Sequence, residues 1–185
     1  MYIDDLRHAL QELAITDSQE IKKDIPDLVE FFLHIRDKRS MCSFIGNGGS
    51  AGIAVHMTAD FLKNGKMRTH SMFDPATITC LANDYGYEHV FSKQLEIVAN
   101  PGDLLVAISS SGNSPNIVNA AEMAKKVGCQ VITFTGFKPD NKLRQMGDFN
   151  IYVPCMEYGI VESIHNMILQ QIVDEIMTKD KEGAK

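Results

Sequence analysis

Apolar residues recur along this chain with two different spacings, which separate predicted helices from predicted strands. Near the N-terminus, apolar positions three or four residues apart predict helices over 2–15 and 17–37. Asp17 or Ser18 is a candidate cap for the second helix, and Pro26 either kinks that helix or marks its true start. Together the two patterns predict an N-terminal helical hairpin.

Short apolar runs alternate with helical patterns after these helices. Such alternation is typical of right-handed βαβ units, so we expect a three-layer α/β fold in which helices flank a mostly parallel sheet. The predicted strands are 41–45, 76–81, 104–109, 130–134 and 149–153. The predicted helices of this region are 50–63, 88–98, 115–127, 141–146 and 158–178.

Length and composition limit the interpretation further. The chain has 185 residues, of which 44% are hydrophobic, so we expect one domain over 1–185. Its expected parts are N-terminal helices in 1–37, an α/β core in 41–178 and a charged, frayed tail in 179–185. The four cysteines are dispersed without a CxxC pair, which favours buried, reduced thiols over a disulfide or metal framework.

Charge and hydropathy exclude some classes of partner. The net charge of −6 argues against a nucleic-acid groove and against binding to an anionic membrane surface. No apolar run reaches the length of a transmembrane helix, and the N-terminus is acidic and amphipathic rather than signal-like. We therefore expect a cytoplasmic protein that holds any anionic ligand by local contacts.

A strand-to-helix crossover between 104–109 and 115–127 has the features of a phosphate site. Its hydroxyls belong to Ser109, Ser110, Ser111 and Ser114. Ser114 suits a helix N-cap and Pro115 suits the first helical position. Unpaired N–H groups and the positive end of the dipole at a helix start stabilise an anion. An ordinary polar turn capped by Ser114 is the alternative.

A second polar crossover follows the predicted strand 41–45. It contains Asn47, Gly48, Gly49 and Ser50, in which glycines permit close approach of a ligand and the side chains offer contacts. Neither a Walker A loop nor a G-x-G-x-x-G spacing is present, so a nucleotide cofactor is not indicated. Two such crossovers predict two walls of one pocket at the carboxyl ends of parallel strands.

Three further groups of side chains are candidates for chemistry. His56 and Asp60 stand four apart on a predicted helix, where they suit a metal site, an acid–base pair or a surface ion pair. Asn83 and Asp84 follow the predicted strand 76–81, either as ligands at its carboxyl end or as a turn cap.

The third group lies on the last predicted helix. Glu162 and His165 are neighbours on its surface, and Gln170 lies on the other flank of Glu162. Exposure to solvent on an amphipathic helix would explain them equally well.

Four segments of the chain resemble the phosphoheptose isomerases of the sugar isomerase (SIS) superfamily. They are GNGGSAGIAVHMTADF, LANDYGYEHVFSKQ, ISSSGNSPNIVNAAEMAKKVGCQVITFTG and IHNMILQQIVDEI. The resemblance implies a five-stranded parallel sheet and a homotetramer with active sites where subunits meet. It also implies conversion of sedoheptulose 7-phosphate to D-glycero-D-manno-heptose 7-phosphate, a step toward lipopolysaccharide or another heptose-containing surface polysaccharide.

The family's site is carried over to this chain by matching positions. The matching substrate-binding residues are Asn47, Gly48, Gly49 and Ser50 of the first loop, Asn83 and Asp84 of a polar pair, and Ser109, Ser110, Ser111 and Ser114 of the phosphate cradle. Glu162 is a further substrate-binding position. His56 matches a histidine that resembles a zinc ligand in metal-containing members.

Three positions depart from the family's pattern. Asp60 stands where the family has glutamate, Glu162 where it has glutamine, and Gln170 where it has a histidine taken as an acid or ligand. Glutamine cannot exchange a proton near neutral pH, so Gln170 cannot replace an acidic histidine. Asp60 and Glu162 are the candidate catalytic carboxylates. His56, Asp60, Glu162 and Gln170 are the candidate ligands of a divalent ion, zinc by resemblance.

The altered positions suggest a different division of labour. In one hypothesis Glu162 is the base, while His56, Asp60 and Gln170 hold the ion. In another, His165 serves as the acid; a hydrogen-bonded core histidine is the alternative for that residue.

Three functions follow from these observations. The first is an aldose–ketose isomerase acting on a phosphorylated sugar through a cis-enediol. The alternative is a non-catalytic SIS protein that binds a sugar phosphate or a protein partner. A transcriptional sensor domain is disfavoured, because no DNA-binding module or basic stripe accompanies the domain.

Overall fold

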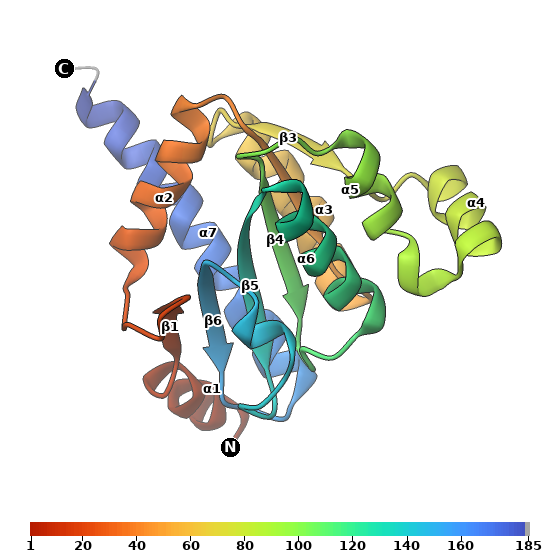
Figure 1. Ribbon diagram of the computed structural model, residues 1–185. Helices are drawn as coiled ribbons and strands as arrows, with labels where there is room; N and C mark the ends of the chain where they lie inside the picture. Colours follow the sequence, from red (N-terminus) through yellow and green to blue (C-terminus); the bar gives the residue numbers. More distant parts are fainter. Residues whose placement is uncertain (184–185) are drawn as a thin grey trace.

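Six strands form one sheet in the computed structural model, which describes residues 1–183 (Figure 1). They are β1 (Ala14–Asp17), β2 (Met41–Ile45), β3 (Arg68–Ser71), β4 (Leu104–Ser109), β5 (Gln130–Gly136) and β6 (Phe149–Val153). Their order is β1-β6-β5-β4-β2-β3, and β1 pairs antiparallel with β6 while the other neighbours run parallel. The expected five parallel strands are present, with an antiparallel sixth strand at one edge.

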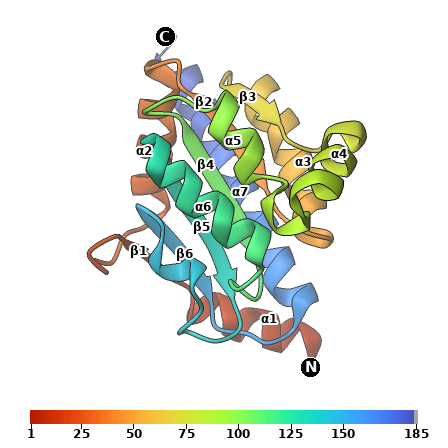
Figure 2. The same cartoon turned by 45° about the vertical axis from the view of Figure 1, so that its right-hand side comes forward.

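Helices cover both faces of this sheet, as the three-layer prediction requires (Figure 2). They are α1 (Tyr2–Gln11), α2 (Ile25–Asp37), α3 (Gly49–Lys63), α4 (Pro75–Tyr85), α5 (Ser92–Val98), α6 (Pro115–Val127) and α7 (Tyr158–Gly183), with short 3₁₀ turns η1 (Tyr87–His89) and η2 (Leu143–Gln145). The helices α2, α3 and α7 pack on one face, and α5 and α6 on the other. A hydrophobic core lies on each face of the sheet, and consecutive residues of β4 point to opposite faces. Val106 packs in the core on the α7 side, and Ala107 packs in the core on the α6 side.

The N-terminal helical hairpin is a wrong prediction, because β1 separates α1 from α2. Ile15 is buried in the core beneath this strand, so its apolar side chain belongs to a strand pattern. Asp24 caps α2 in place of Asp17 or Ser18, since its carboxylate accepts the Asp27 N–H and its own N–H is bonded to Asp27. Pro26 lies in the first turn, so it marks the start of the helix rather than a kink.

The predicted strand 76–81 is also wrong, because these residues form part of α4. The Asp74 carboxylate accepts the Thr77 N–H at 2.8 Å, and Pro75 opens the helix. A local cap therefore overrides the β-branched, apolar composition of the segment. The missing parallel strand is β3, a short edge strand whose polar residues give no apolar run.

The other predicted elements agree with the structure in type or position. The strands 41–45, 104–109 and 149–153 and the helix 115–127 have the predicted bounds. The helix 88–98 divides into part of η1 and α5, and 141–146 shortens to η2. The predicted frayed tail is helical through Gly183, and residues 184–185 lie outside the described residues.

Candidate active site

The candidate site lies where the connections of the sheet reverse direction. Strands β2 and β4 are neighbours, but the chain leaves β2 through α3 toward β3 and leaves β4 through α6 toward β5. In open parallel sheets a ligand binds in the crevice outside the carboxyl ends of two such strands. Both polar crossovers, 46–50 and 109–114, lie at this point.

A cavity of about 110 Å³ is formed between the two crossovers and the start of α7. Its lining residues are Asn47, Ser50, Ser109, Ser110, Ser111, Ser114, Tyr158 and Glu162. All of these except Tyr158 are predicted site residues, so the structure brings the two loops together as expected. Tyr158 is the first residue of α7, and no pattern in the sequence distinguishes it.

The serine side of the cavity is suited to an anion. Ser114 is the N-cap of α6, and its hydroxyl lies 3.4 Å from that of Ser109. The Ser110 hydroxyl is buried, and within residues 1–183 it has no hydrogen-bond partner. A buried polar atom without a partner is costly, so a ligand oxygen that bonds to Ser110 would be stabilised. The positive end of the α6 dipole adds to this preference for negative charge.

Glu162 belongs to α7 and lines the cavity across from the serine side. Its carboxylate lies against the α-carbon of Gly49, where the Cβ of any other residue would overlap it. Gly48, the N-cap of α3, has a left-handed φ of 54° that favours glycine. The two glycines thus allow a carboxylate to approach the positive end of α3. Glu162 therefore shares one cavity with the serine cradle.

Asn47 is held by two residues that the sequence reasoning missed. Its amide forms two hydrogen bonds with the amide of Asn116, one in each direction, with lengths of 2.9 and 2.8 Å. The Tyr87 hydroxyl donates a third bond of 3.0 Å to Asn47 Oδ1. The one sequence signal for Asn116 is a polar residue beside the apolar face of α6, where it is buried.

His56, Asp60 and Gln170 form a second cluster between α3 and α7. The Asp60 Oδ2 atom lies 3.2 Å from His56 Nε2 and accepts a 2.9 Å hydrogen bond from Gln170 Nε2. Glu162 is not part of this cluster, because its carboxylate faces Gly49. Three of the four predicted metal ligands therefore meet, and the fourth lies apart.

The His56–Asp60 spacing is compatible with two ligands of one zinc ion, but Gln170 presents its Nε2, a hydrogen-bond donor, to Asp60. Two ligand atoms of one tetrahedral zinc ion lie about 3.3 Å apart, close to the His56–Asp60 separation. Within residues 1–183, no three His, Cys, Asp or Glu side chains gather closely enough to hold a metal ion. Zinc binding with three protein ligands would require the Gln170 amide to turn its oxygen toward the ion, and it stays a prediction.

Asn83 and Asp84 are not at the carboxyl end of a strand, which corrects the prediction for this pair. They lie in the last turn of α4, where Asn83 Nδ2 donates to Asp84 Oδ1 at 2.9 Å. Both side chains are exposed and lie outside the cavity lining. The error follows from the wrong strand at 76–81, and a substrate role for the pair stays a prediction.

His165 is a hydrogen-bonded core histidine, which was the alternative to a role as the acid. It is fully buried, its Nε2 lies 3.0 Å from the Thr135 carbonyl oxygen, and its ring packs edge-on against Phe134. Burial lowers the pKa of His165 to about 4, although the Thr135 hydrogen bond acts in the other direction. A neutral, buried imidazole outside the cavity lining is not placed to serve as the acid.

Residues 1–136 match the model of a family described as "SIS domain". The chain belongs to the SIS domain family. A phosphoheptose isomerase from Fusobacterium nucleatum is 35% identical over 167 residues, which cover 86% of this chain and 84% of the relative. Another from Geotalea daltonii is 32% identical, with 90% of each chain covered. Within the SIS domain family, the chain is a member of the phosphoheptose isomerase group.

Solved structures that are similar to this chain include phosphoheptose isomerases. A phosphoheptose isomerase from Neisseria gonorrhoeae has a TM-score of 0.82 and 28% identity, with 96% of this chain and 95% of that chain covered. The similarity therefore extends over both crossovers and α7. The predicted SIS fold and family are confirmed.

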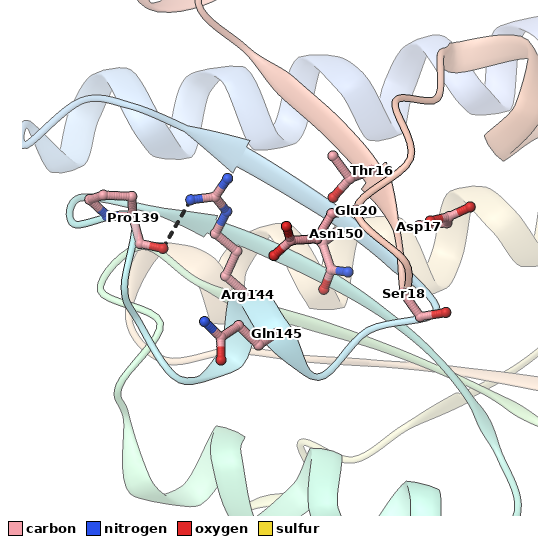
Figure 3. A pocket seen from close by; sticks show the side chains of 8 residues that line it. All are labelled: Thr16, Asp17, Ser18, Glu20, Pro139, Arg144, Gln145 and Asn150. Atoms are coloured by element: carbon pink, nitrogen blue, oxygen red, sulfur yellow. Dashed lines mark hydrogen bonds between the residues drawn. The ribbon is translucent and has the colours of Figure 1, made fainter.

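A larger hollow of this SIS domain lies elsewhere and is a weaker candidate for the site. It measures about 460 Å³ and lies beside β1, β6 and η2 (Figure 3). The groups that line it are engaged in local structure: Arg144 donates to the Pro139 carbonyl, and the Asp17 carboxylate accepts two backbone N–H groups. It contains none of the predicted site residues.

In the described part of the chain, no helix is long and apolar enough to cross a membrane.

Proposed function

We propose that this SIS domain converts sedoheptulose 7-phosphate to D-glycero-D-manno-heptose 7-phosphate by aldose–ketose isomerisation. The observation that carries the proposal is the cavity at the switch point, where an anion-binding serine cradle and the Glu162 carboxylate face the same space. The isomerase group to which the chain belongs supplies the reaction class, and this geometry supplies the groups that the reaction needs.

The serine cradle is assigned to the phosphate group of the substrate. Among the described residues the Ser110 hydroxyl has no partner, Ser109 and Ser114 belong to the same crossover, and α6 begins there. Hydroxyl and backbone N–H donors bind a phosphate without any lysine or arginine. An acidic protein can thus hold a dianion at this one place.

Glu162 is assigned to proton transfer. Isomerisation through a cis-enediol needs a base that takes a proton from one of the carbons C1 and C2 and returns it to the other. Glu162 is the carboxylate that lines the cavity, whereas Asp60 is bonded to Gln170 in the neighbouring cluster. Of the two candidate catalytic carboxylates, Glu162 is therefore favoured as the base.

The second cluster does not line the cavity, so it would act on the substrate only through a bound ion. His56, Asp60 and Gln170 would hold a divalent ion there. When bound, such an ion polarises a carbonyl group as a Lewis acid. In this proposal the serines bind the phosphate group, Glu162 transfers the proton, and the second cluster holds the ion.

Other expectations from the resemblance and from the composition stay predictions. They are the homotetramer with active sites between subunits, the cytoplasmic location and a role in making heptose-containing surface polysaccharide. The non-catalytic alternative is less favoured, because the named relatives are isomerases and a carboxylate lines the cavity.

Incubation with sedoheptulose 7-phosphate in D₂O tests the proposed reaction. We expect deuterium beside the carbonyl group and formation of the aldose, both followed by NMR, because the base exchanges its proton with solvent during isomerisation. Calorimetry with the same sugar phosphate measures binding separately. Binding without exchange or product at high protein concentration would overturn the isomerase assignment and support the non-catalytic alternative.

A further inference from the structure

The side chain of Asn47 lines the candidate cavity, yet most of its hydrogen-bonding capacity is used within the protein. Its Oδ1 atom accepts from Asn116 Nδ2 at 2.8 Å and from the Tyr87 hydroxyl at 3.0 Å. Its Nδ2 atom donates to Asn116 Oδ1 at 2.9 Å. The two partners come from η1 and α6, distant in sequence from the first loop.

Counting donors and acceptors shows what remains for a ligand. A side-chain amide has two N–H donors and a carbonyl oxygen with two lone pairs. The bonds to Asn116 and Tyr87 fill both lone pairs and one N–H. Within residues 1–183, one N–H of Asn47 is left, and it belongs to a residue that lines the cavity.

We propose that Asn116 and Tyr87 are positioning residues that fix Asn47 as a hydrogen-bond donor toward the bound sugar phosphate. This inference rests on the proposed function of the cavity. It assigns to Asn47 a ligand atom that accepts a hydrogen bond, and we infer a phosphate oxygen because Asn47 and the serine cradle line the same cavity of about 110 Å³. A hydroxyl hydrogen at the same place would find no acceptor on Asn47.

Burial makes Asn116 suitable for this role. Its side chain is almost fully buried, and the paired amides connect the two crossovers that form the walls of the cavity. A donor held in place before the ligand arrives loses little entropy on binding. Tyr87 is exposed, so its hydroxyl sets the amide orientation without supporting the core.

The variant Asn116→Asp tests the amide pair. A carboxylate still accepts from Asn47 Nδ2 but has no N–H for Asn47 Oδ1, which leaves one lone pair of Asn47 open. Because residue 116 is almost fully buried, a carboxylate there costs stability that the positive end of the α6 dipole partly offsets, and urea unfolding checks that the variant is folded. We expect binding of inorganic phosphate, measured by calorimetry, to weaken at least about tenfold.

Asn119→Asp is the matched control for charge. Asn119 lies on α6 one turn after Asn116, and its amide donates to the Glu88 carbonyl instead of to Asn47. The control adds the same charge to the same helix and should change phosphate affinity by less than about twofold. Equal weakening in both variants would assign the effect to charge alone and overturn the proposed role of Asn116.

Tyr87→Phe tests the third bond without adding charge. Loss of one hydrogen bond to Asn47 should weaken phosphate binding about three- to tenfold and raise KM more than it lowers kcat. The side-chain amide signals of Asn47 give a readout independent of activity. In the wild-type protein we expect phosphate to shift mainly one of the two amide protons, and in both variants this selectivity should be lost.

The outcomes separate this inference from the proposed function. Wild-type phosphate binding together with unchanged affinity and unchanged Asn47 signals in Asn116→Asp and Tyr87→Phe would overturn the positioning role alone. Absence of phosphate binding by the wild-type protein would overturn the cavity's assignment, and with it the inference.

Discussion

The carboxylate of Glu162 lies against the α-carbon of Gly49, so that α7 presents an acid at the first turn of α3. The two residues are far apart in sequence, and their contact places the candidate base beside the serine cradle. A Cβ at this position would overlap the Glu162 carboxylate, so any other residue would require that carboxylate to shift.

Gly49→Ala should therefore damage catalysis more than folding. The added Cβ would overlap the Glu162 carboxylate, and misplacement of a catalytic group by about 1 Å can cost on the order of a hundredfold in rate. We expect a loss of this size in kcat, measured by the isomerisation assay. Gly52→Ala is the control on the same helix, since a Cβ there has no described atom within 4 Å. Equal activity of the two variants would contradict the proposed importance of the contact.

Ser110→Ala should weaken ligand binding without destabilising the protein. Its hydroxyl is buried without a partner in the described structure, so its removal relieves an unsatisfied group. We expect unchanged or slightly higher resistance to urea and about tenfold weaker binding of inorganic phosphate. Ser163→Ala, on the exposed side of α7, should leave phosphate binding unchanged. Full phosphate affinity in Ser110→Ala would exclude the hydroxyl as a ligand.

His165 should make the fold sensitive to acid. Burial lowers its pKa in the folded protein to about 4, below the ordinary value of 6.5 that we expect in the unfolded chain. The unfolded state therefore binds more protons between these values, so stability contributed by the neutral imidazole is complete above pH 6.5 and decreases as the pH falls toward 4. The full difference corresponds to on the order of 3 kcal/mol.

Urea unfolding at several pH values measures this dependence. We expect His165→Gln to be less stable than the wild type at pH 7 but to lose less stability between pH 6.5 and 4. His34→Gln, at an exposed position, should keep the wild-type dependence. A wild-type slope in His165→Gln would show that another group is responsible.

His56 should be required for zinc binding, if the second cluster holds the ion. We expect one Zn²⁺ per chain in competition with a chromophoric chelator, and at least tenfold weaker binding by His56→Ala because one of three protein ligands is lost. His8→Ala, on α1, is the control. Equal zinc affinity in His56→Ala and the wild type would place the ion elsewhere.

Much of the site could be predicted from local sequence. The crossover at 109–114 follows a strand of apolar residues and precedes a helix marked by Ser114 and Pro115, so both elements were found with the observed bounds. The crossover at 46–50 was found for similar reasons. Because parallel strands present their carboxyl ends at one edge of a sheet, the meeting of the two loops also followed from the pattern.

The errors arose where local composition and local capping disagree. The segment 76–81 has the residues of a strand, but the Asp74 cap starts a helix through it. The strand β3 is polar because it lies at the edge of the sheet, so hydropathy does not reveal it. The bonds of Asn47 to Tyr87 and Asn116 join residues distant in sequence, and no spacing rule anticipates them.

Solvent-deuterium incorporation by Glu162→Gln tests the central claim most directly. Glutamine keeps the size of the side chain but cannot carry the proton. We predict that Glu162→Gln still binds inorganic phosphate, yet incorporates deuterium from D₂O into the sugar phosphate at least about a thousandfold more slowly than the wild type. Glu175→Gln, on the same helix and outside the cavity lining, should retain wild-type exchange. Exchange by Glu162→Gln at the wild-type rate would contradict the assignment of Glu162 as the base.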